Sequence, residues 1–511
     1  MKRILTFFLL LALLLWVPGE ARAATEEKFI FGMVYEGGAA INPLYCNQRD
    51  LTSLNELVFE SVVTLDDELK PVCELALSYT VKDREYTFEL RQNVRFHDGT
   101  YMGAYDVVAT YEHIMSLGSR CPYYARCSNI SKIEVVDMYT IRVTGKHKSF
   151  LTMYAMTFPV LQHDSLTMNL PTGTGPYWYM YSDTEWVQID ANPYWWKRAP
   201  VVDTVYVFRY DDTASALRAL STGEVDAVPT RSQTAALGRL LSDRMSVDYS
   251  TLTYEMLVPN IRSELFKDVR TRKALMYAID VSTVAQNIYM GMVMKSEVPV
   301  ITGSWLYEPQ SAIYYHSMER ALHLLLEAGW GDYNGDGILD KVVNGVLEQL
   351  DFTILTYVDD AANTRTHAAQ LIADQLAPLG IHIEVKTLSK SSVQKRLKNR
   401  DFDMVLCGIN MAITPDLSHL LNGGDTLNYS GYYSTAMNEL MQKLYETTDE
   451  AEFKSLMSRA QILLADDLPF LGLFFRKGTL MTTADISGLS AVIEGDVLRG
   501  FEYIQFQQIK K

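Results

Sequence analysis

The chain has 511 residues, of which 48% are hydrophobic and 21% charged, and its formal net charge is −16. One hydrophobic core stops growing well below this length, so we expect two or more lobes. The negative charge argues against nucleic acid and anionic lipid as main partners, because both are polyanions.

The amino terminus predicts export. Two basic residues precede an apolar run over 4–17, and a small-x-small motif follows at 21–23. This order is typical of a secretory signal peptide, so we expect residues 1–23 to be cleaved off. The run is shorter than the roughly 20 apolar residues that a membrane-spanning helix needs. We therefore expect a periplasmic or extracellular protein.

The cysteines indicate structural roles. They are Cys46, Cys73, Cys121, Cys127 and Cys407. No cysteine directly follows the cleavage motif, so we expect no lipid anchor. Cys121 and Cys127 are close enough in sequence to form a local disulfide in an oxidising compartment. No pair has the Cys-x-x-Cys spacing of a zinc or redox site, and we expect no cofactor.

Strand and helix patterns alternate along the chain. Apolar residues alternate with polar ones over 86–90 and over 139–143, which predicts half-buried strands. Helical spacing over 363–379 ends at Gly380, a typical helix C-cap, and a third alternating stretch follows over 381–385. This succession of helices and strands predicts an α/β architecture.

Six longer segments carry a resemblance. They read Val58–Tyr111, GTGPYWY at Gly173–Tyr179, ALSTGEVDAV at Ala219–Val228, LFKDVRTRKALMYAID at Leu265–Asp280, EAGWGDYNGDGILDK at Glu327–Lys341, and DFDMVL at Asp401–Leu406. Together, and in this order, they resemble the family 5 extracellular solute-binding proteins of peptide- and nickel-type ABC importers. One departure is the absence of the tryptophan common after the DFDMVL-type strand, where this chain has residues 407–410.

The resemblance implies a two-lobed periplasmic-binding-protein fold of type II, with a ligand cleft at the hinge. Lobe I would comprise 24–57, 172–262 and 486–511, the extra subdomain 58–171, and lobe II 263–485. The chain would cross the hinge near 262 and again near 485.

The resemblance also implies a function. The protein would capture short peptides by hinge closure, as a monomer, and deliver them to an ABC permease and ATPase complex. The same fold could instead carry a nickel chelate, haem, a sugar or an opine, or act as a ligand sensor independent of transport. The metalloprotease H-E-x-x-H and hydrolase G-x-S-x-G motifs are absent, so we do not expect an enzyme.

Asp416 is the first candidate for ligand binding. By the resemblance, it would pair with the α-ammonium of a peptide, in a charge-assisted hydrogen bond. The alternative is that it only caps the next helix. Arg365, near the start of the predicted helix, could bind a ligand carboxylate, and its alternative is a solvated surface arginine.

Further candidates would contact the backbone of the ligand. They are Gly408, Ile409, Asn410, Met411 and Ala412 in one segment, Thr172, Gly173, Thr174 and Gly175 in another, and Tyr35 and Asn42 after the first strand. Glycines allow close backbone approach, but they also mark tight turns at lobe crossings.

A weak calcium candidate completes the set. Asp332, Asn334, Asp336 and Asp340 follow the spacing of the first half of a calcium loop. Position 12 of that loop is Val343, where an EF-hand needs a bidentate glutamate.

Overall fold

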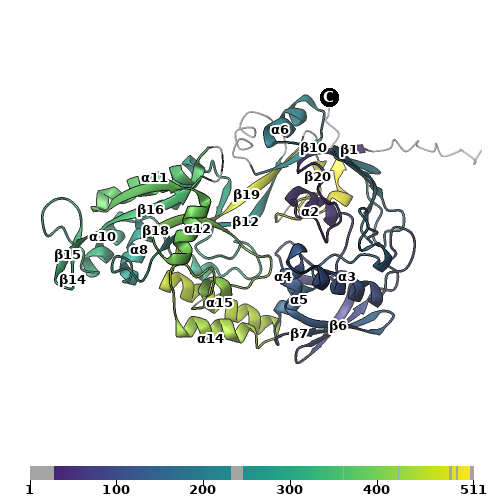
Figure 1. Ribbon diagram of the computed structural model, residues 1–511, viewed down its shortest axis with the longest axis horizontal. Helices are drawn as coiled ribbons and strands as arrows, with labels where there is room; N and C mark the ends of the chain where they lie inside the picture. The colour runs from purple at the N-terminus through teal and green to yellow at the C-terminus, as the bar shows by residue number, and fades with distance from the viewer. Residues whose placement is uncertain are drawn as a thin grey trace, which may run out of the picture.

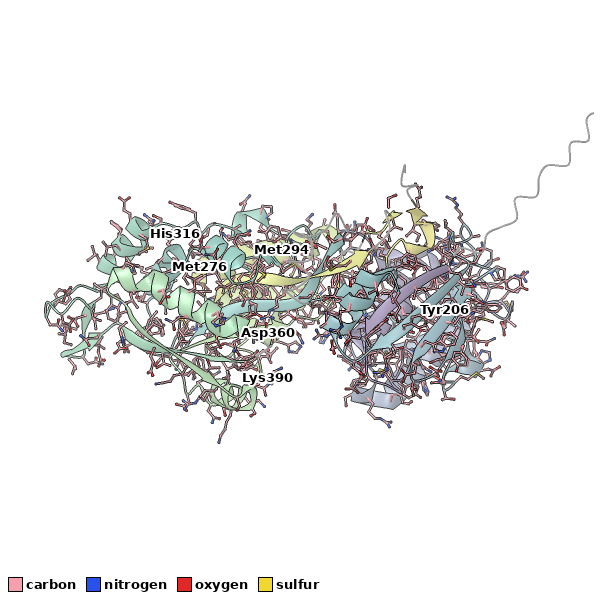
Figure 2. All side chains as sticks on the ribbon, turned by 90° about the horizontal axis from the view of Figure 1, so that it is seen from above. Tyr206, Met276, Met294, His316, Asp360 and Lys390 are labelled. Carbon is pink, nitrogen blue, oxygen red and sulfur yellow. The ribbon has the colours of Figure 1, made fainter. Side chains whose placement is uncertain are left out.

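The computed structural model describes residues 28–231, 246–358, 360, 362–423, 425–482, 486–490 and 493–506. The expected signal peptide over 1–23 lies outside this part. Two bodies stand side by side and are joined by two long strands (Figures 1 and 2). Among the described residues, no helix is both long and apolar enough to cross a membrane.

One mixed sheet of eleven strands runs through both bodies. Its order is β17 (His382–Leu388), β16 (Asp351–Tyr357), β18 (Met404–Asn410), β12 (Ser246–Pro259), β19 (Leu471–Thr482), β11 (Ala227–Thr230), β1 (Lys28–Val34), β10 (Thr204–Tyr210), β9 (Trp186–Ala191) and β8 (Tyr177–Ser182), while β13 (Val293–Lys295) pairs with β19. The strands from β11 to β8 belong to lobe I, those from β17 to β18 to lobe II, and β12 and β19 serve both.

Helices cover the sheet in each lobe. Lobe I carries α2 (Arg49–Glu56) and α6 (Thr213–Thr222), and short β20 (Ile486–Ser487) and β21 (Gln505–Phe506) pair near the carboxyl terminus. Lobe II carries α8 (Val269–Ala278), α9 (Val281–Asn287), α10 (Met318–Glu327), α11 (Thr364–Leu376), α12 (Lys390–Asn399), α13 (Ser418–Leu421), α14 (Thr435–Leu444) and α15 (Glu450–Asp467), with the hairpin β14 (Asp340–Val343) and β15 (Val346–Gln349).

A separate four-stranded sheet lies inside the segment expected to be the extra subdomain. Its order is β4 (Ala76–Lys82), β5 (Glu85–Leu90), β7 (Thr140–Gly145) and β6 (Ile130–Asp137), accompanied by the pair β2 (Val63–Leu65) and β3 (Pro71–Cys73) and by α3 (Ala104–Leu117), α4 (Tyr124–Cys127) and α5 (Leu151–Ala155). Within the described residues, these strands form ladders only with one another.

The predicted local elements are confirmed. The alternating stretches over 86–90 and 139–143 become β5 and β7, and the apolar side chains of β5 are buried. The predicted helix over 363–379 is α11 with a final 3-10 turn, and Gly380 ends it with a φ of 77°. The alternating stretch after it is β17, parallel to β16.

We call β12 and β19 the hinge strands, because they carry the chain between the two lobes. The amino-terminal half of β12 pairs with the lobe I end of β19, and its register shifts between Ser250 and Tyr254. From Thr253 onward, β12 also pairs with β18 of lobe II. The chain therefore passes between the lobes along these strands, and the expected crossings near 262 and 485 lie just beyond their carboxyl ends.

The extra subdomain touches lobe II away from the hinge strands, beside α14 and α15 (Figure 1). Ser149 Oγ donates to the Leu444 carbonyl over 2.5 Å, and the Phe150 N–H donates to the Thr447 carbonyl over 2.9 Å. The Phe150 ring packs 5.4 Å from the Phe453 ring. The two bodies thus meet both at the hinge and at this contact.

All five cysteines are unpaired in the structure, and the local disulfide that Cys121 and Cys127 could form is not present in it. Both thiols are buried, and the Cys127 thiol points to the carbonyl of Ala155, 3.9 Å away.

Candidate ligand-binding site

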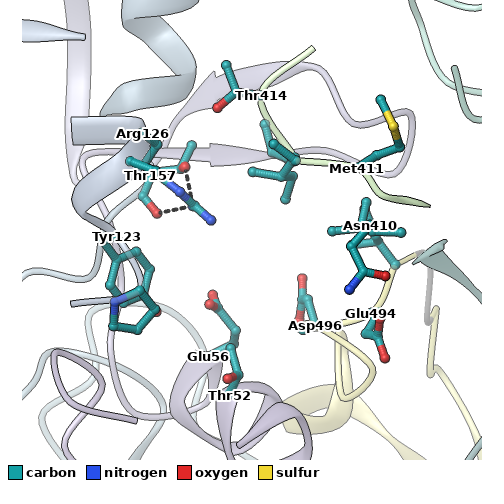
Figure 3. A pocket seen from close by; sticks show the side chains of 18 of the residues that line it. Thr52, Glu56, Tyr123, Arg126, Thr157, Asn410, Met411, Thr414, Glu494 and Asp496 are labelled. Atoms are coloured by element: carbon teal, nitrogen blue, oxygen red, sulfur yellow. Dashed lines mark hydrogen bonds between the residues drawn. The ribbon is translucent and has the colours of Figure 1, made fainter. Parts of the chain in front are cut away.

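A cavity of about 500 Å³, here called the central cavity, lies between the three parts of the molecule. Lobe I contributes residues from α2 and from 493–496, the subdomain contributes α4 and Thr157, and lobe II contributes 410–416. Polar and charged side chains point into this space from several sides (Figure 3). A solute in this cavity can contact both lobes at once.

Asp416 lies on the lobe II wall of the central cavity and is half-buried. One carboxylate oxygen accepts the Ser418 N–H over 2.9 Å at the start of α13, and the other accepts the hydroxyl of Tyr445. The residue therefore accepts the first N–H of α13 and also faces the cavity. Because each carboxylate oxygen can accept more than one hydrogen bond, the group retains capacity for a ligand cation.

The segment around the end of β18 divides into two parts. Asn410, Met411 and Ala412 line the central cavity, as the sequence predicted for a binding wall. The Met411 N–H, however, donates to the Leu252 carbonyl over 2.8 Å and is satisfied within the protein. Gly408, together with Ile409 within β18, lies further back: a Cβ at Gly408 would come within 2.8 Å of the Arg365 guanidinium.

Residues 172–175 do not line the central cavity. The Gly175 N–H donates to the Val58 carbonyl over 3.0 Å, and a Cβ on Gly173 would lie 2.3 Å from that same oxygen. Thr174 is fully buried. This packing favours the alternative, a tight crossing between lobe I and the subdomain, because no side chain fits against the Val58 backbone. The ligand contact by 172–175 stays a prediction.

Asn42 and Tyr35 also lie away from the central cavity. The Asn42 amide donates to the carbonyls of Leu166 and Met168, over 2.9 and 2.8 Å, and so fastens the first segment to the subdomain. Tyr35 is 6% exposed, and burial raises the pKa of its phenol to about 12. Both residues are part of the packed framework, and their contact with a ligand stays a prediction.

Arg365 is buried, so the alternative of a solvated surface arginine is wrong. Its guanidinium donates to both carboxylate oxygens of Glu255, over 3.0 and 2.8 Å, and lies 4.3 Å from the ring centre of Tyr357. Arg476 donates to the same carboxylate over 2.6 Å. Sequence reasoning missed Glu255, whose signal is a single acidic residue inside the apolar stretch of β12.

This ion-pair cluster forms part of the wall of a second cavity of about 650 Å³, here called the basic cavity. Six basic side chains and one acidic side chain line it, and it shares Arg49 and Asn410 with the central cavity. Asp360 and Lys390 are on its lobe II side, facing lobe I (Figure 2). Burial alone would raise the pKa of Glu255, but Arg365 and Arg476 outweigh burial and lower it.

Other charged residues of the central cavity were also missed. Arg126 donates to the hydroxyl and carbonyl of Thr157, over 2.9 and 3.3 Å, and points into the cavity (Figure 3). Glu56 and Asp496 point into the same space from lobe I. These residues come from three separate segments, so no local sequence pattern could have grouped them.

The loop of the calcium candidate is held by hydrogen bonds to its own backbone. The carboxylate of Asp332 accepts the N–H groups of Gly335 and Gly337, over 2.7 and 3.1 Å, and Asp336 accepts that of Ile338 over 2.9 Å. Throughout the described part of the chain, no group of three or more His, Cys, Asp or Glu side chains is arranged to hold a metal ion. Asp332, Asn334, Asp336 and Asp340 instead shape the turn before β14.

Comparisons with known proteins agree with this architecture. The oligopeptide-binding protein AppA of Bacillus subtilis is 23% identical over 474 residues, covering 88% of this chain and 86% of AppA. The glutathione-binding protein GsiB of Shigella dysenteriae is 23% identical over 500 residues, covering 92% and 93%. The crystal structure of a nickel ABC transporter from Bacillus halodurans has a TM-score of 0.81 at 20% identity, covering 92% of this chain and 98% of that one.

The family itself is shown by a match over residues 70–429 to the middle part of the bacterial extracellular solute-binding proteins, family 5. The resemblance carried by the six segments is thus confirmed, as are the two-lobed fold and the substrate-binding role in an ABC importer that it implied. The chain belongs to the family 5 bacterial extracellular solute-binding proteins.

Proposed function

We propose that this protein captures short peptides in the periplasm and delivers them to an ABC permease and ATPase complex, acting as a monomer and not as an enzyme. The supporting observation is the position of Asp416, whose carboxylate lies on the cavity wall and is oriented by Ser418 and Tyr445. Curated relatives whose names include peptide-binding proteins add to this support.

The physical argument concerns the ammonium group of the peptide. A charge-assisted hydrogen bond from that ammonium to Asp416 is strong in a cavity that closes around it. A blocked amino terminus would lose this bond and leave the carboxylate desolvated and unpaired, which costs free energy. The ligand favours lobe closure only by the contacts that it gains in the closed state, and a cavity lined from both lobes supplies such contacts.

Thermal melting against a ligand panel tests this proposal. The panel contains di- to octapeptides, their N-acetylated forms, free amino acids, nickel–histidine, haem and oligosaccharides. A ligand present at 100 times its Kd adds about 2.7 kcal/mol to the free energy of unfolding, so the melting midpoint rises by several degrees. We expect free peptides to raise the midpoint and N-acetylated peptides to have little effect.

A matched pair of variants makes the test specific. Asp416→Asn should remove most of the peptide-induced shift, whereas Asp401→Asn should keep it, because the Asp401 side chain is 71% exposed and does not line the central cavity. If nickel–histidine, haem or an oligosaccharide stabilises the protein and peptides do not, the peptide assignment is wrong while the family and fold stand.

A further inference from the structure

A third cavity of about 510 Å³, here called the acidic cavity, adjoins the central cavity. The two share Glu56, Thr64, Leu65, Asp496 and Arg499 as a common wall. Eight acidic and only two basic side chains line the acidic cavity. This space therefore adjoins the candidate ligand site and is lined by a strong excess of acidic side chains.

The two basic side chains neutralise only part of this charge. Lys197 lies 3.2 Å from Glu60 and 3.0 Å from Glu74. Arg499 lies 3.3 Å from Asp67 and 2.6 Å from Asp496.

Other carboxylates of the acidic cavity remain unmatched. Glu56, Glu68 and Glu502 form no ion pair with any residue that the structure describes. Glu56 is exposed to the cavity and has no side-chain hydrogen bond within the described chain (Figure 3).

Glu60 lines the same cavity, but its carboxylate has a structural role. Its side chain is 3% exposed and accepts hydrogen bonds from the indole N–H groups of Trp195 and Trp196 and from the hydroxyl of Thr174. Glu56 has no such set of donors. Its carboxylate is therefore available to a group that enters from the central cavity.

The electrostatics of the wall favour a positively charged guest. Desolvation by the surrounding cavity walls, followed by the charges of Asp496 and Glu74, raises the pKa of Glu56 to about 8. Burial raises the pKa of Asp496 as well. A cation placed between these carboxylates would stabilise their charged forms and would itself be stabilised by them. The carboxylates are spread along a cavity rather than gathered at one point, which suits an extended organic cation.

We propose that the acidic cavity receives the basic side chain, lysine or arginine, of a bound peptide, which enters between Glu56 and Asp496. This inference rests on the proposed function and adds a preference within it: among peptides, the protein favours those with a cationic side chain at one position. The flexible aliphatic stem of lysine or arginine can run from the central cavity into the acidic one while the charged head meets the carboxylates.

Calorimetric titration with matched peptides tests the inference. The probes are alanine tri- and pentapeptides that carry one lysine at successive positions, each paired with the same peptide carrying Nε-acetyl-lysine. Acetylation keeps the stem and removes the charge. At one position we expect the lysine peptide to bind at least tenfold more tightly than its acetylated partner, and this ratio should fall as salt is raised.

Two variants test whether the preference for lysine over acetyl-lysine depends on Glu56. Glu56→Gln should reduce the lysine to acetyl-lysine ratio to less than threefold. Glu384→Gln makes the same change in net charge on an exposed strand of lobe II, 56% exposed, and should leave the ratio unchanged. Equal reduction by both variants would show a long-range field instead of a site in the acidic cavity and would overturn the inference.

The outcomes separate the two proposals. If alanine peptides bind with a free amino terminus but lysine and acetyl-lysine peptides bind equally at every position, the acidic-cavity inference is wrong and the peptide function stands. If no peptide binds, both are wrong.

Discussion

The basic and acidic cavities differ in how their charges are balanced. Both adjoin the central cavity, and their volumes are about 650 and 510 Å³. In the wall of the basic cavity, Glu255 binds Arg365 and Arg476, and Arg231 is paired with Asp50. In the acidic cavity, Glu56, Glu68 and Glu502 form no close ion pair with any described residue.

Charged groups that the fold already pairs can thus be distinguished from charged groups that remain available to a ligand. Glu255 is fully buried, and both its oxygens are occupied, so its charge is already satisfied by the fold. Glu56 is exposed to a cavity and unpaired within the described chain. A folded protein keeps such unmatched charge at a cost in stability, which a ligand of opposite charge can offset.

The largest loss of stability should come from the basic cavity, where the charges in the wall are paired. Glu255→Gln removes the carboxylate that compensates two guanidinium groups, one of them 3% exposed. Breaking a buried ion pair by removing one partner typically costs about 3–5 kcal/mol in the free energy of unfolding. Urea denaturation should show this loss, with Glu384→Gln as the near-neutral control. A loss below 1 kcal/mol would mean that the buried cluster does not support the hinge strands.

An intermediate loss of stability is expected at Gly173, which packs against Val58 and Phe59 beside the acidic cavity. Gly173→Ala would place a Cβ 2.3 Å from the Val58 carbonyl and 2.6 Å from the Phe59 ring. Overpacking of this kind typically costs about 1–3 kcal/mol in stability. Denaturation should reveal that loss, while peptide affinity measured by calorimetry stays close to wild type. A variant with normal stability and lost affinity would restore 172–175 as a ligand contact.

The smallest expected change in stability comes from Glu56 in the acidic cavity, and it depends on pH. A carboxyl group whose folded-state pKa is raised favours the folded state at pH values below its unfolded pKa, near 4.5, and this contribution is lost as pH rises through about 8. The charged groups that face Glu56 are Asp496, Glu74, Arg126 and Arg499. The unliganded protein should therefore lose stability between pH 5.5 and pH 8.

Glu56→Gln should weaken this pH dependence. Because Glu56 is exposed to water in the cavity, screening reduces the effect, and we expect a difference of about 1 kcal/mol between variant and wild type at pH 8. Urea denaturation at pH 5.5 and at pH 8 measures this difference in the free energy of unfolding. If the variant and the wild type lose the same stability, Glu56 carries no unfavourable charge in the unliganded state.

Much of the fold was predictable because its signals are local. Alternation over 86–90 and helical spacing before Gly380 each lie within one segment, and both elements were confirmed. Asp416 and 410–412 were placed by resemblance, and they do line the central cavity.

The remaining site residues depend on contacts between distant segments. Glu56, Arg126 and Asp496 meet only after three parts of the chain fold together. The glycines at 173 and 175 pack on the Val58 backbone, and close approach to that backbone gives the same sequence signal as close approach to a ligand.

The most direct test of the account is a calorimetric cycle of two ligands and two proteins. The ligands are one tight-binding peptide and its N-acetylated form, and the proteins are wild type and Asp416→Asn. We expect acetylation to weaken wild-type binding by tenfold or more, about 1.4 kcal/mol, and to have little further effect on the variant, because both changes remove the same ammonium–carboxylate contact. If the two losses simply add, the ammonium binds elsewhere and Asp416 only accepts the first N–H of α13.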